Sequence, residues 1–232
     1  MLVILDPGHG GWDPGGGTNE LWKEKDLNLK ISQYQNRRFR DLGIPSRLSR
    51  EGDETLTPQE RVARINSMLT DNTILISNHI NVSGSKGAEV IYSIDNSPLL
   101  AQMIAEEIRK TGQTIRNVYT RTNAMGQDYY FILRDTFADE SVLIEYGFAD
   151  NIDDKQRLYY NWQALAEAVV RAVANYLEFP YSMPFYTIHV VRPGESLYTI
   201  ARDYNITFDK LIRDNGLTSD ELAVGQELFI YL

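Results

Sequence analysis

Residues 2–11 read LVILDPGHGG, and this stretch decides the fold class. The apolar run from Leu2 to Leu5 predicts a strand that is buried on both faces, as strands of parallel sheets are. The run ends in Asp6-Pro7-Gly8, which suits the end of a buried strand. His9 follows at once. Open α/β sheets carry their sites beyond the carboxyl ends of strands, so His9 is placed where such a site would lie.

Strands and helices alternate after this stretch. We predict strands at residues 2–5, 44–48, 73–77, 88–93 and 141–145, and helices at 26–42, from 58, from 98 and at 162–177. The helix start at Pro58 is supported by Thr57 as the cap and by Glu60, which can close a capping box. This alternation predicts an α/β domain over residues 1–178, with a mostly parallel twisted sheet and helices on both faces.

The last quarter of the chain has a different organisation. Residues 179–185 contain two prolines and no periodicity, so they are interpreted as a linker. Residues 186–232 read strand, helix, helix, strand, which predicts a small separate βααβ domain.

Composition excludes several classes of protein. The 232 residues are 43% hydrophobic and 24% charged, which is ordinary for a globular protein. No apolar run is long enough to cross a bilayer. The absence of cysteine excludes disulfide scaffolds, cysteine nucleophiles and thiolate zinc sites. The net charge of −9 argues against a nucleic-acid partner, although a local basic patch stays open.

Three polar residues lie near strand ends on this interpretation, and a fourth lies on the loop that leaves His9. His9 follows the first strand, and His79 lies two residues past the strand 73–77. Glu145 closes the strand 141–145, and Glu24 stands just ahead of the first helix. Two histidines and one carboxylate are a common ligand set for catalytic zinc, and a further carboxylate can move a proton.

Each of these residues also has a plainer interpretation. His9 can belong to a flexible glycine-rich turn, His79 can be a hydrogen-bonded core histidine, and Glu24 a solvated residue at a helix start. Glu145 is the most informative, because a solitary carboxylate in an apolar strand is costly to bury unless it is paired or bound to metal. His189, in the predicted tail strand, is interpreted as a surface or packing residue.

Four separated motifs resemble the zinc-dependent N-acetylmuramoyl-L-alanine amidases of the amidase-3 type. They are the stretch from Leu5 to Gly11; Glu24 with Asn28; Ser77-Asn78-His79-Ile80-Asn81; and the block from Val142 to Phe148 followed by Asn151. Ser49-Arg50, Asp53 and Arg61 belong to the same resemblance, which covers about residues 1–178. Asn78 and Ile80 depart from the usual residues of their motif, which concerns substrate fit more than metal binding.

The resemblance implies a peptidoglycan hydrolase. Such an enzyme cuts the amide between the lactyl group of N-acetylmuramic acid and L-alanine of the stem peptide. Carried over by position, His9, Glu24 and His79 are similar to the Zn²⁺ ligands, and Glu145 to the catalytic carboxylate. We expect Glu145 to act as general base towards water and then as proton donor to the leaving amine.

The tail resembles a LysM module, a domain that binds glycans containing N-acetylglucosamine. The resemblance implies that two loops line the glycan groove, and their residues are Gly194, Glu195, Ser196, Leu197, Asn215, Gly216 and Leu217. A small packing domain without a ligand is the alternative. A binding module joined to a hydrolase raises the local concentration of substrate.

Two other functions stay open at this point. One is a glycan-binding wall protein whose hydrolase domain is inactive. The other is a nucleotide-binding domain, which is disfavoured because Asp13 stands where the third glycine of G-x-G-x-x-G would fall. We expect action at the bacterial cell wall. The sequence shows no signal peptide, so we expect either release from the cytoplasm, as by a phage endolysin or a mother-cell enzyme, or a leader outside the sequence given.

Overall fold

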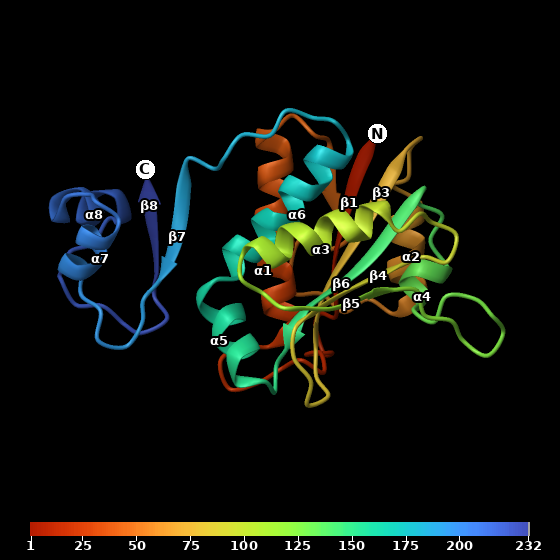
Figure 1. The fold of residues 1–232 in the computed structure, drawn as a ribbon, viewed down its shortest axis with the longest axis horizontal. Coiled ribbons are helices and arrows are strands. Elements are labelled where there is room, and N and C mark those ends of the chain that lie inside the picture. The colour runs from red at the N-terminus through yellow and green to blue at the C-terminus, as the bar shows by residue number, and fades with distance from the viewer. Residues whose placement is uncertain (232) are drawn as a thin grey trace.

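A six-stranded sheet forms the centre of the larger part of the molecule (Figure 1). The computed structural model describes residues 1–231. The strand order is β2-β1-β3-β6-β4-β5. The strands are β1 (Leu2–Pro7), β2 (Ser46–Leu48), β3 (Thr73–Asn81), β4 (Ala88–Tyr92), β5 (Ile115–Tyr119) and β6 (Glu140–Phe148). β2, β1, β3 and β6 are parallel, whereas β4 runs antiparallel to β6 and parallel to β5. The predicted mostly parallel sheet is confirmed.

Helices cover both faces of the sheet, as predicted. They are α1 (Glu24–Asp41), α2 (Pro58–Asn66), α3 (Leu99–Lys110), α4 (Phe131–Arg134), α5 (Ile152–Tyr160) and α6 (Trp162–Tyr176). Helices α1, α3 and α6 pack on one face, and α2 and α4 on the other. Within residues 1–231 no helix has the length and apolar character needed to cross a membrane.

The alternation of side chains along β1 explains the two cores. Val3 and Leu5 point into the cluster shared with α1, α3 and α6, whereas Leu2 and Ile4 point into the cluster shared with α2 and α4. All four are buried. A strand with core on both sides needs an uninterrupted apolar run, and this is why the stretch at residues 2–5 predicts the architecture.

The predicted start of α2 is confirmed in detail. The hydroxyl of Thr57 accepts a hydrogen bond from the Glu60 amide at 3.2 Å, and the Thr57 amide donates to the Glu60 carboxylate at 2.8 Å. Pro58 occupies the first turn, where its missing N–H costs nothing.

Several expectations about individual elements were wrong. The strands predicted at 73–77 and 141–145 continue to Asn81 and Phe148, so His79 and Glu145 lie inside strands rather than at or beyond their ends. Glu24 is the first residue of α1 and is only 1% exposed, not a residue ahead of the helix. Strand β5 was not predicted, because its short sequence IRNVY carries no strict alternation of apolar and polar residues and it lies at the edge of the sheet.

The C-terminal residues form the predicted βααβ unit. Its elements are β7 (Tyr186–Val190), α7 (Leu197–Asp203), α8 (Phe208–Asn215) and β8 (Glu227–Tyr231). β7 and β8 pair antiparallel, and the unit has an apolar core of its own built around Leu211, Leu228 and Ile230.

This unit packs against the larger part of the molecule through β7 and β8. Ile188 and its strand neighbours join the apolar cluster of α1 and α6. The Gln163 side-chain oxygen accepts hydrogen bonds from the Ile188 amide at 2.6 Å and the Thr187 hydroxyl at 3.0 Å. The Glu227 carboxylate accepts from the Trp162 indole at 2.8 Å and pairs with Lys30. Apolar burial and hydrogen bonds thus hold the two parts together.

The segment interpreted as a linker is also held in place. Arg38 of α1 and Glu167 of α6 form a buried bidentate ion pair. The Nε and Nη2 atoms of Arg38 each donate to one carboxylate oxygen of Glu167 at 3.0 Å. Arg38 also donates to the carbonyl oxygen of Ser182 at 2.7 Å, and the Tyr181 hydroxyl donates to Glu167 at 2.9 Å. The ion pair of the larger domain therefore anchors the chain that leads to β7.

Candidate metal centre and active site

The turn after β1 is held by two buried arginines. Arg61 donates to the carbonyl oxygens of Pro7 at 2.7 Å and His9 at 2.6 Å. Arg50 donates to the carbonyl oxygens of Pro7 and Gly8, both at 3.0 Å. His9 has a left-handed backbone with φ of 62°, which costs energy for a residue with a side chain. The arginine contacts hold the turn in this strained form and so fix the direction of the His9 ring.

Asp6 links Arg61 to the sheet. Its carboxylate accepts hydrogen bonds from Arg61 at 2.9 Å, Ser49 at 2.5 Å and Ser77 at 2.8 Å. Asp6 is 1% exposed, so the charge would be costly to bury without these donors. The network joins the ends of β1, β2 and β3 beneath the site.

His9, Glu24 and His79 converge on one point. The Nε2 atom of His9 lies 3.2 Å from Oε1 of Glu24, and Nδ1 of His79 lies 3.3 Å from the same oxygen. One ligand atom from each residue lies within 4.8 Å of the others. The predicted ligand residues, 70 positions apart at the extremes, are therefore brought together by β1, α1 and β3.

The spacing fits a zinc ion. Zinc bonds to nitrogen and oxygen are about 2.0–2.1 Å long, so ligand atoms of a tetrahedral site lie about 3.3 Å apart. The distances from His9 Nε2 and from His79 Nδ1 to Glu24 Oε1, 3.2 and 3.3 Å, agree with this value. Two imidazoles and one carboxylate leave a fourth position open, which is the arrangement of catalytic zinc sites.

Further contacts orient the three side chains. Nδ1 of His9 lies 2.6 Å from the Asp13 carboxylate, and this leaves Nε2 to face Glu24. Glu24 accepts hydrogen bonds from the Gly17 amide at 2.7 Å and the Ile80 amide at 3.0 Å. Contacts of this kind fix the orientation of ligands and tune their basicity in metal sites. Asp13 was not among the predicted site residues; only its position four residues after His9 pointed to it.

Electrostatic interactions among His9, Asp13, Glu24 and His79 favour the charged forms of His9 and Glu24. Burial alone would lower the pKa of His9, but Glu24 and Asp13 outweigh burial and raise it to about 9. Burial alone would raise the pKa of Glu24, but His79 and His9 outweigh burial and hold it well below its usual range. Without metal, the Glu24 carboxylate is thus negative at neutral pH and His9 carries a proton.

This charge state predicts that zinc affinity rises with pH. Because the His9 pKa is raised in the folded protein, zinc must displace a proton at any pH below about 9. The apparent affinity is expected to increase by up to about tenfold per pH unit between about 6.5 and 9 and then to level off. Competition against a chromophoric chelator over this range measures the effect. A flat profile would contradict it.

The register of the sheet places Glu145 beside His79. On one side Glu145 pairs with His79 of β3, and on the other with Glu89 of β4. Parallel pairing to β3 and antiparallel pairing to β4 thus put two carboxylates and a histidine in one row. Glu89 was not predicted as a site residue, and no local signal in the sequence marks it.

Glu145 has the properties of a proton carrier. It is 8% exposed, and its Oε2 atom is buried without a hydrogen-bond partner among residues 1–231. Burial raises the pKa of Glu145 to about 7; His79 opposes this effect, and the carboxylates of Glu24 and Glu89 add to it. A carboxyl group with a pKa near neutrality can both accept and return a proton.

One cavity of about 180 Å³ contains His9, His79 and Glu145. Its remaining wall is largely apolar and comes from the α2 start and from α4; the wall residues include Leu56, Pro58, Tyr130, Phe131, Ile132 and Leu143. Leu143 lies on β6, two residues before Glu145. The cavity thus joins a candidate metal centre and a candidate proton carrier to an apolar wall that can hold small substrate methyl groups.

Gly8 is required by the position of the His79 ring. A Cβ atom at Gly8 would lie 2.3–2.6 Å from three atoms of that ring. The substitution G8A is expected to push His79 out of place, lowering zinc affinity at least about tenfold and stability by about 1–3 kcal/mol. Zinc titration and thermal unfolding measure both effects.

A matched control is available at Gly52, where an added Cβ meets nothing within 4 Å. G52A is expected to keep the zinc affinity of the unaltered protein. If G8A also kept it, the placement of His79 in the site would be wrong.

The residues predicted to bind glycan occupy two loops of the βααβ unit. Ser196 caps α7, and Leu197 is buried in the core of the unit. Glu195 accepts hydrogen bonds from the Arg192 amide and His189, both at 2.7 Å. His189 is therefore a packing residue, in agreement with its interpretation from the sequence.

The second loop is also committed to internal contacts. Asn215 donates to the carbonyl oxygens of Leu211 and Phe229 and accepts from the Phe229 amide at 2.6 Å. Gly216 has a left-handed backbone with φ of 60°, and Leu217 packs on the core. Most side chains of both loops thus shape the loops, so glycan binding there would depend on backbone groups and the few exposed atoms.

Comparison with known protein families gives two matches. Residues 3–175 match the Amidase_3 family, described as N-acetylmuramoyl-L-alanine amidase. Residues 189–230 match the LysM domain family. Both resemblances noted in the sequence are confirmed.

Individual relatives agree with the family match. The chain is 30% identical over 181 residues to the uncharacterized protein YqiI of Bacillus subtilis, covering 76% of this chain and 84% of that protein. It is 30% identical over 187 residues to the N-acetylmuramoyl-L-alanine amidase CwlM of Bacillus licheniformis, covering 75% of this chain and 66% of that protein. The structure of the amidase AmiC2 of Nostoc punctiforme is similar with a TM-score of 0.66 and 26% identity, covering 77% of this chain and 97% of that one.

Proposed function

Because the chain belongs to the Amidase_3 family of N-acetylmuramoyl-L-alanine amidases, we propose that it hydrolyses peptidoglycan at the bond between N-acetylmuramic acid and L-alanine. Water supplies the oxygen that joins the lactyl carbon, and the carbon–nitrogen bond breaks. The products are a lactyl carboxylate on the glycan and a free amine on the stem peptide. Its place of action is the bacterial cell wall.

The observation that carries this proposal is the shared cavity. His9 and His79 each present a ring nitrogen to Glu24 at the spacing of ligands in a tetrahedral zinc site, and both histidines open into the cavity that Glu145 lines. A zinc ion held by these three residues would polarise the amide carbonyl and activate water. An inactive domain has no need to keep the ligand set and the buried carboxylate together.

Glu145 performs the proton transfers in this proposal. Its carboxylate takes a proton from the attacking water, and the resulting carboxyl group donates a proton to the leaving nitrogen. Because its pKa is about 7, neither state is strongly disfavoured near neutral pH. Asp13 holds His9, and Arg50 and Arg61 hold the turn that carries His9, so these groups are positioned before substrate binds.

The LysM domain supports a role in anchoring. We propose that its two loops, at residues 194–197 and 215–217, bind N-acetylglucosamine-containing strands of the wall. Anchoring keeps the amidase domain near its substrate, which raises the effective concentration of cleavable bonds.

Digestion of purified peptidoglycan tests the proposed reaction. The chain is incubated with sacculi with and without a chelator, and the released products are analysed by mass spectrometry. Stem peptides with a free L-alanine amine are expected, lost on chelation and restored by zinc. Binding to sacculi with no release of peptides would instead identify a wall-binding protein without amidase activity.

A further inference from the structure

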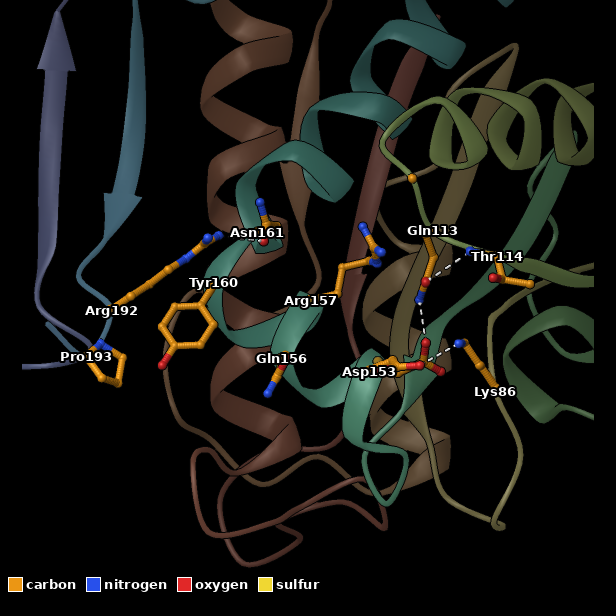
Figure 2. A pocket seen from close by; sticks show the side chains of 12 residues that line it. Lys86, Gln113, Thr114, Asp153, Gln156, Arg157, Tyr160, Asn161, Arg192 and Pro193 are labelled. Carbon is orange, nitrogen blue, oxygen red and sulfur yellow. Dashed lines mark hydrogen bonds and ion pairs between the residues drawn. The ribbon is translucent and has the colours of Figure 1, made fainter. Parts of the chain in front are cut away.

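A polar cleft lies between the two domains, away from the candidate metal centre. Its volume is about 630 Å³, which is within the roughly 300–1,000 Å³ typical of small-molecule sites. Figure 2 shows its wall: α5 and the start of α6 on one side, the turn at residues 112–114 above, and Arg192 with Pro193 reaching in from the LysM domain. None of the lining residues belongs to the cavity that holds Glu145.

Two arginines in this cleft form no ion pair with the described residues, although Asp153, four residues before Arg157, has its pKa lowered by Lys86 and to a smaller extent by the charge of Arg157. Arg157 of α5 donates only to the carbonyl oxygen of Thr111, at 3.3 Å. Arg192 donates to the Asn161 side chain at 3.4 Å, and its guanidinium lies over the Tyr160 ring, 5.3 Å from the centroid. Within residues 1–231 neither forms an ion pair. In a chain with a net charge of −9, the lining of this cleft carries a net positive charge, because Lys86, Arg157 and Arg192 outnumber Asp153 and Asp154.

The acidic groups of the cleft are already satisfied. Asp154 accepts hydrogen bonds from the Gly87 amide at 2.7 Å, from the Phe148 amide at 3.0 Å and from Gln113 at 3.2 Å. Asp153 pairs with Lys86 at 2.6 Å (Figure 2). The charged residues of the lining, Lys86, Arg157 and Arg192 against Asp153 and Asp154, leave one net positive charge, and Arg157 and Arg192 are the cations that form no ion pair among residues 1–231. Arginine is suited to binding carboxylates, because its planar group offers several donors in a fixed arrangement.

Residues of both domains line the cleft, and hydrogen bonds between the domains fix its width. Arg192 reaches it from the LysM domain, two residues before Gly194 of the predicted glycan loop. The hydrogen bonds of Gln163 to β7 and of Trp162 to Glu227 fix the distance between the domains. Pro193 lines the cleft and directly precedes Gly194, so the cleft adjoins the loop that is predicted to bind glycan.

We propose that this cleft binds the lactyl carboxylate of a muramic acid residue on a glycan strand from which the stem peptides have been removed. The inference rests on the proposed amidase reaction, which turns each uncharged lactyl amide into a carboxylate. Arg157 and Arg192, which both line the cleft, supply the positive charge that attracts this carboxylate, and the exposed amides of Gln156 and Asn161 offer hydrogen bonds to sugar hydroxyl groups. The site then retains the enzyme on the strand that it has cut.

Binding measurements with the full chain test this site. The probe is a set of glycan strands stripped of stem peptides by an unrelated amidase, and the neutral comparison is an oligomer of N-acetylglucosamine. The double variant R157Q/R192Q is expected to bind stripped strands about tenfold or more weakly, through loss of two charge-assisted contacts. Its binding to the neutral oligomer is expected to change by less than about twofold, because that probe has no carboxylate.

Arg202 provides a matched control on the LysM domain, because it is exposed and pairs only with its neighbour Asp203. R202Q is expected to bind both probes as the unaltered chain does. Unchanged binding of stripped strands by the double variant would overturn the proposal. An equal loss on both probes would also overturn it, because the arginines would then support the LysM domain itself.

Two further measurements complete the test. One distinguishes a lactyl carboxylate from a peptide carboxylate, and the other distinguishes a failure of the cleft proposal from a failure of the amidase proposal. If free stem peptides bind and lose affinity in the double variant to the same extent, the site recognises a peptide carboxylate and the lactyl assignment is wrong. The stripped strands are prepared without this chain, so their binding is measured even if the chain hydrolyses nothing. A failure of the amidase proposal is therefore seen in the digestion, and a failure of the cleft proposal in the binding.

Discussion

The substitution E145Q is expected to lower the rate of amide hydrolysis by about 10³–10⁴-fold, at the upper end of what one general acid–base residue contributes. Glutamine keeps the shape of the side chain but neither accepts a proton from water nor returns one to the amine. Because the metal ligands are other residues, zinc binding should stay within about threefold of the unaltered value. Release of stem peptides and a zinc titration measure the two quantities on the same samples.

The same substitution has a predicted effect on stability. The pKa of Glu145 is raised from 4.5 to about 7 in the folded protein, so the ionised side chain destabilises the fold as pH rises between these values. Without metal, E145Q should therefore unfold at a higher temperature than the unaltered chain above pH 7, and the two should converge below about pH 4.5.

Glu140 is the matched control for Glu145. It is the first residue of the same strand, is half-buried, and accepts a hydrogen bond from Tyr176 at 3.1 Å. E140Q can keep this contact and should keep its activity. Wild-type turnover by E145Q would show that another group moves the proton.

The substitution H79A is expected to lower zinc affinity by more than about 100-fold, which is the upper range for loss of a group that merely supports a ligand. His79 supplies one of only three ligand atoms, and its Nδ1 lies 3.3 Å from Glu24. Activity should be lost with the metal and return in part at high zinc concentration. Metal content after dialysis and the zinc dependence of digestion measure both.

His189 is the control for H79A, because it is the one remaining histidine of the chain and lies in β7. H189A removes hydrogen bonds to Glu195 and Tyr204, so it is expected to unfold more easily and still to retain zinc. Normal zinc content in H79A would remove His79 from the site. Equal loss in both variants would show that destabilisation alone releases the metal.

The residues of the candidate site were predictable, but their arrangement was not. His9, Glu24, His79 and Glu145 were named from strand positions and motif resemblance. The sequence places Glu145 at the end of a strand, whereas the structure places it inside β6 between His79 and Glu89. The neighbours of Glu145 depend on the order of the strands in the sheet. That order depends on how the apolar faces of helices and strands far apart in the chain pack together.

Several functional groups were missed because they act through distant contacts. Asp6 bonds to Arg61 across 55 positions, and its role depends on three strands meeting. Glu89 gains its importance because β4 inserts antiparallel beside β6, a reversal that no local pattern encodes. Asp13 is the exception, since its spacing of four from His9 made the contact available to local reasoning.

What the sequence by itself determined is local. The apolar run of β1, the box between Thr57 and Glu60, and the βααβ order of the tail all depend on contacts within a few residues, where the backbone leaves little choice. The tertiary structure alone decided the row of Glu89, Glu145 and His79 and the cleft of Arg157 and Arg192. Those groups meet because apolar faces far apart in the chain are buried together. The free energy gained by burying them depends on the packing of the whole domain rather than on any one segment.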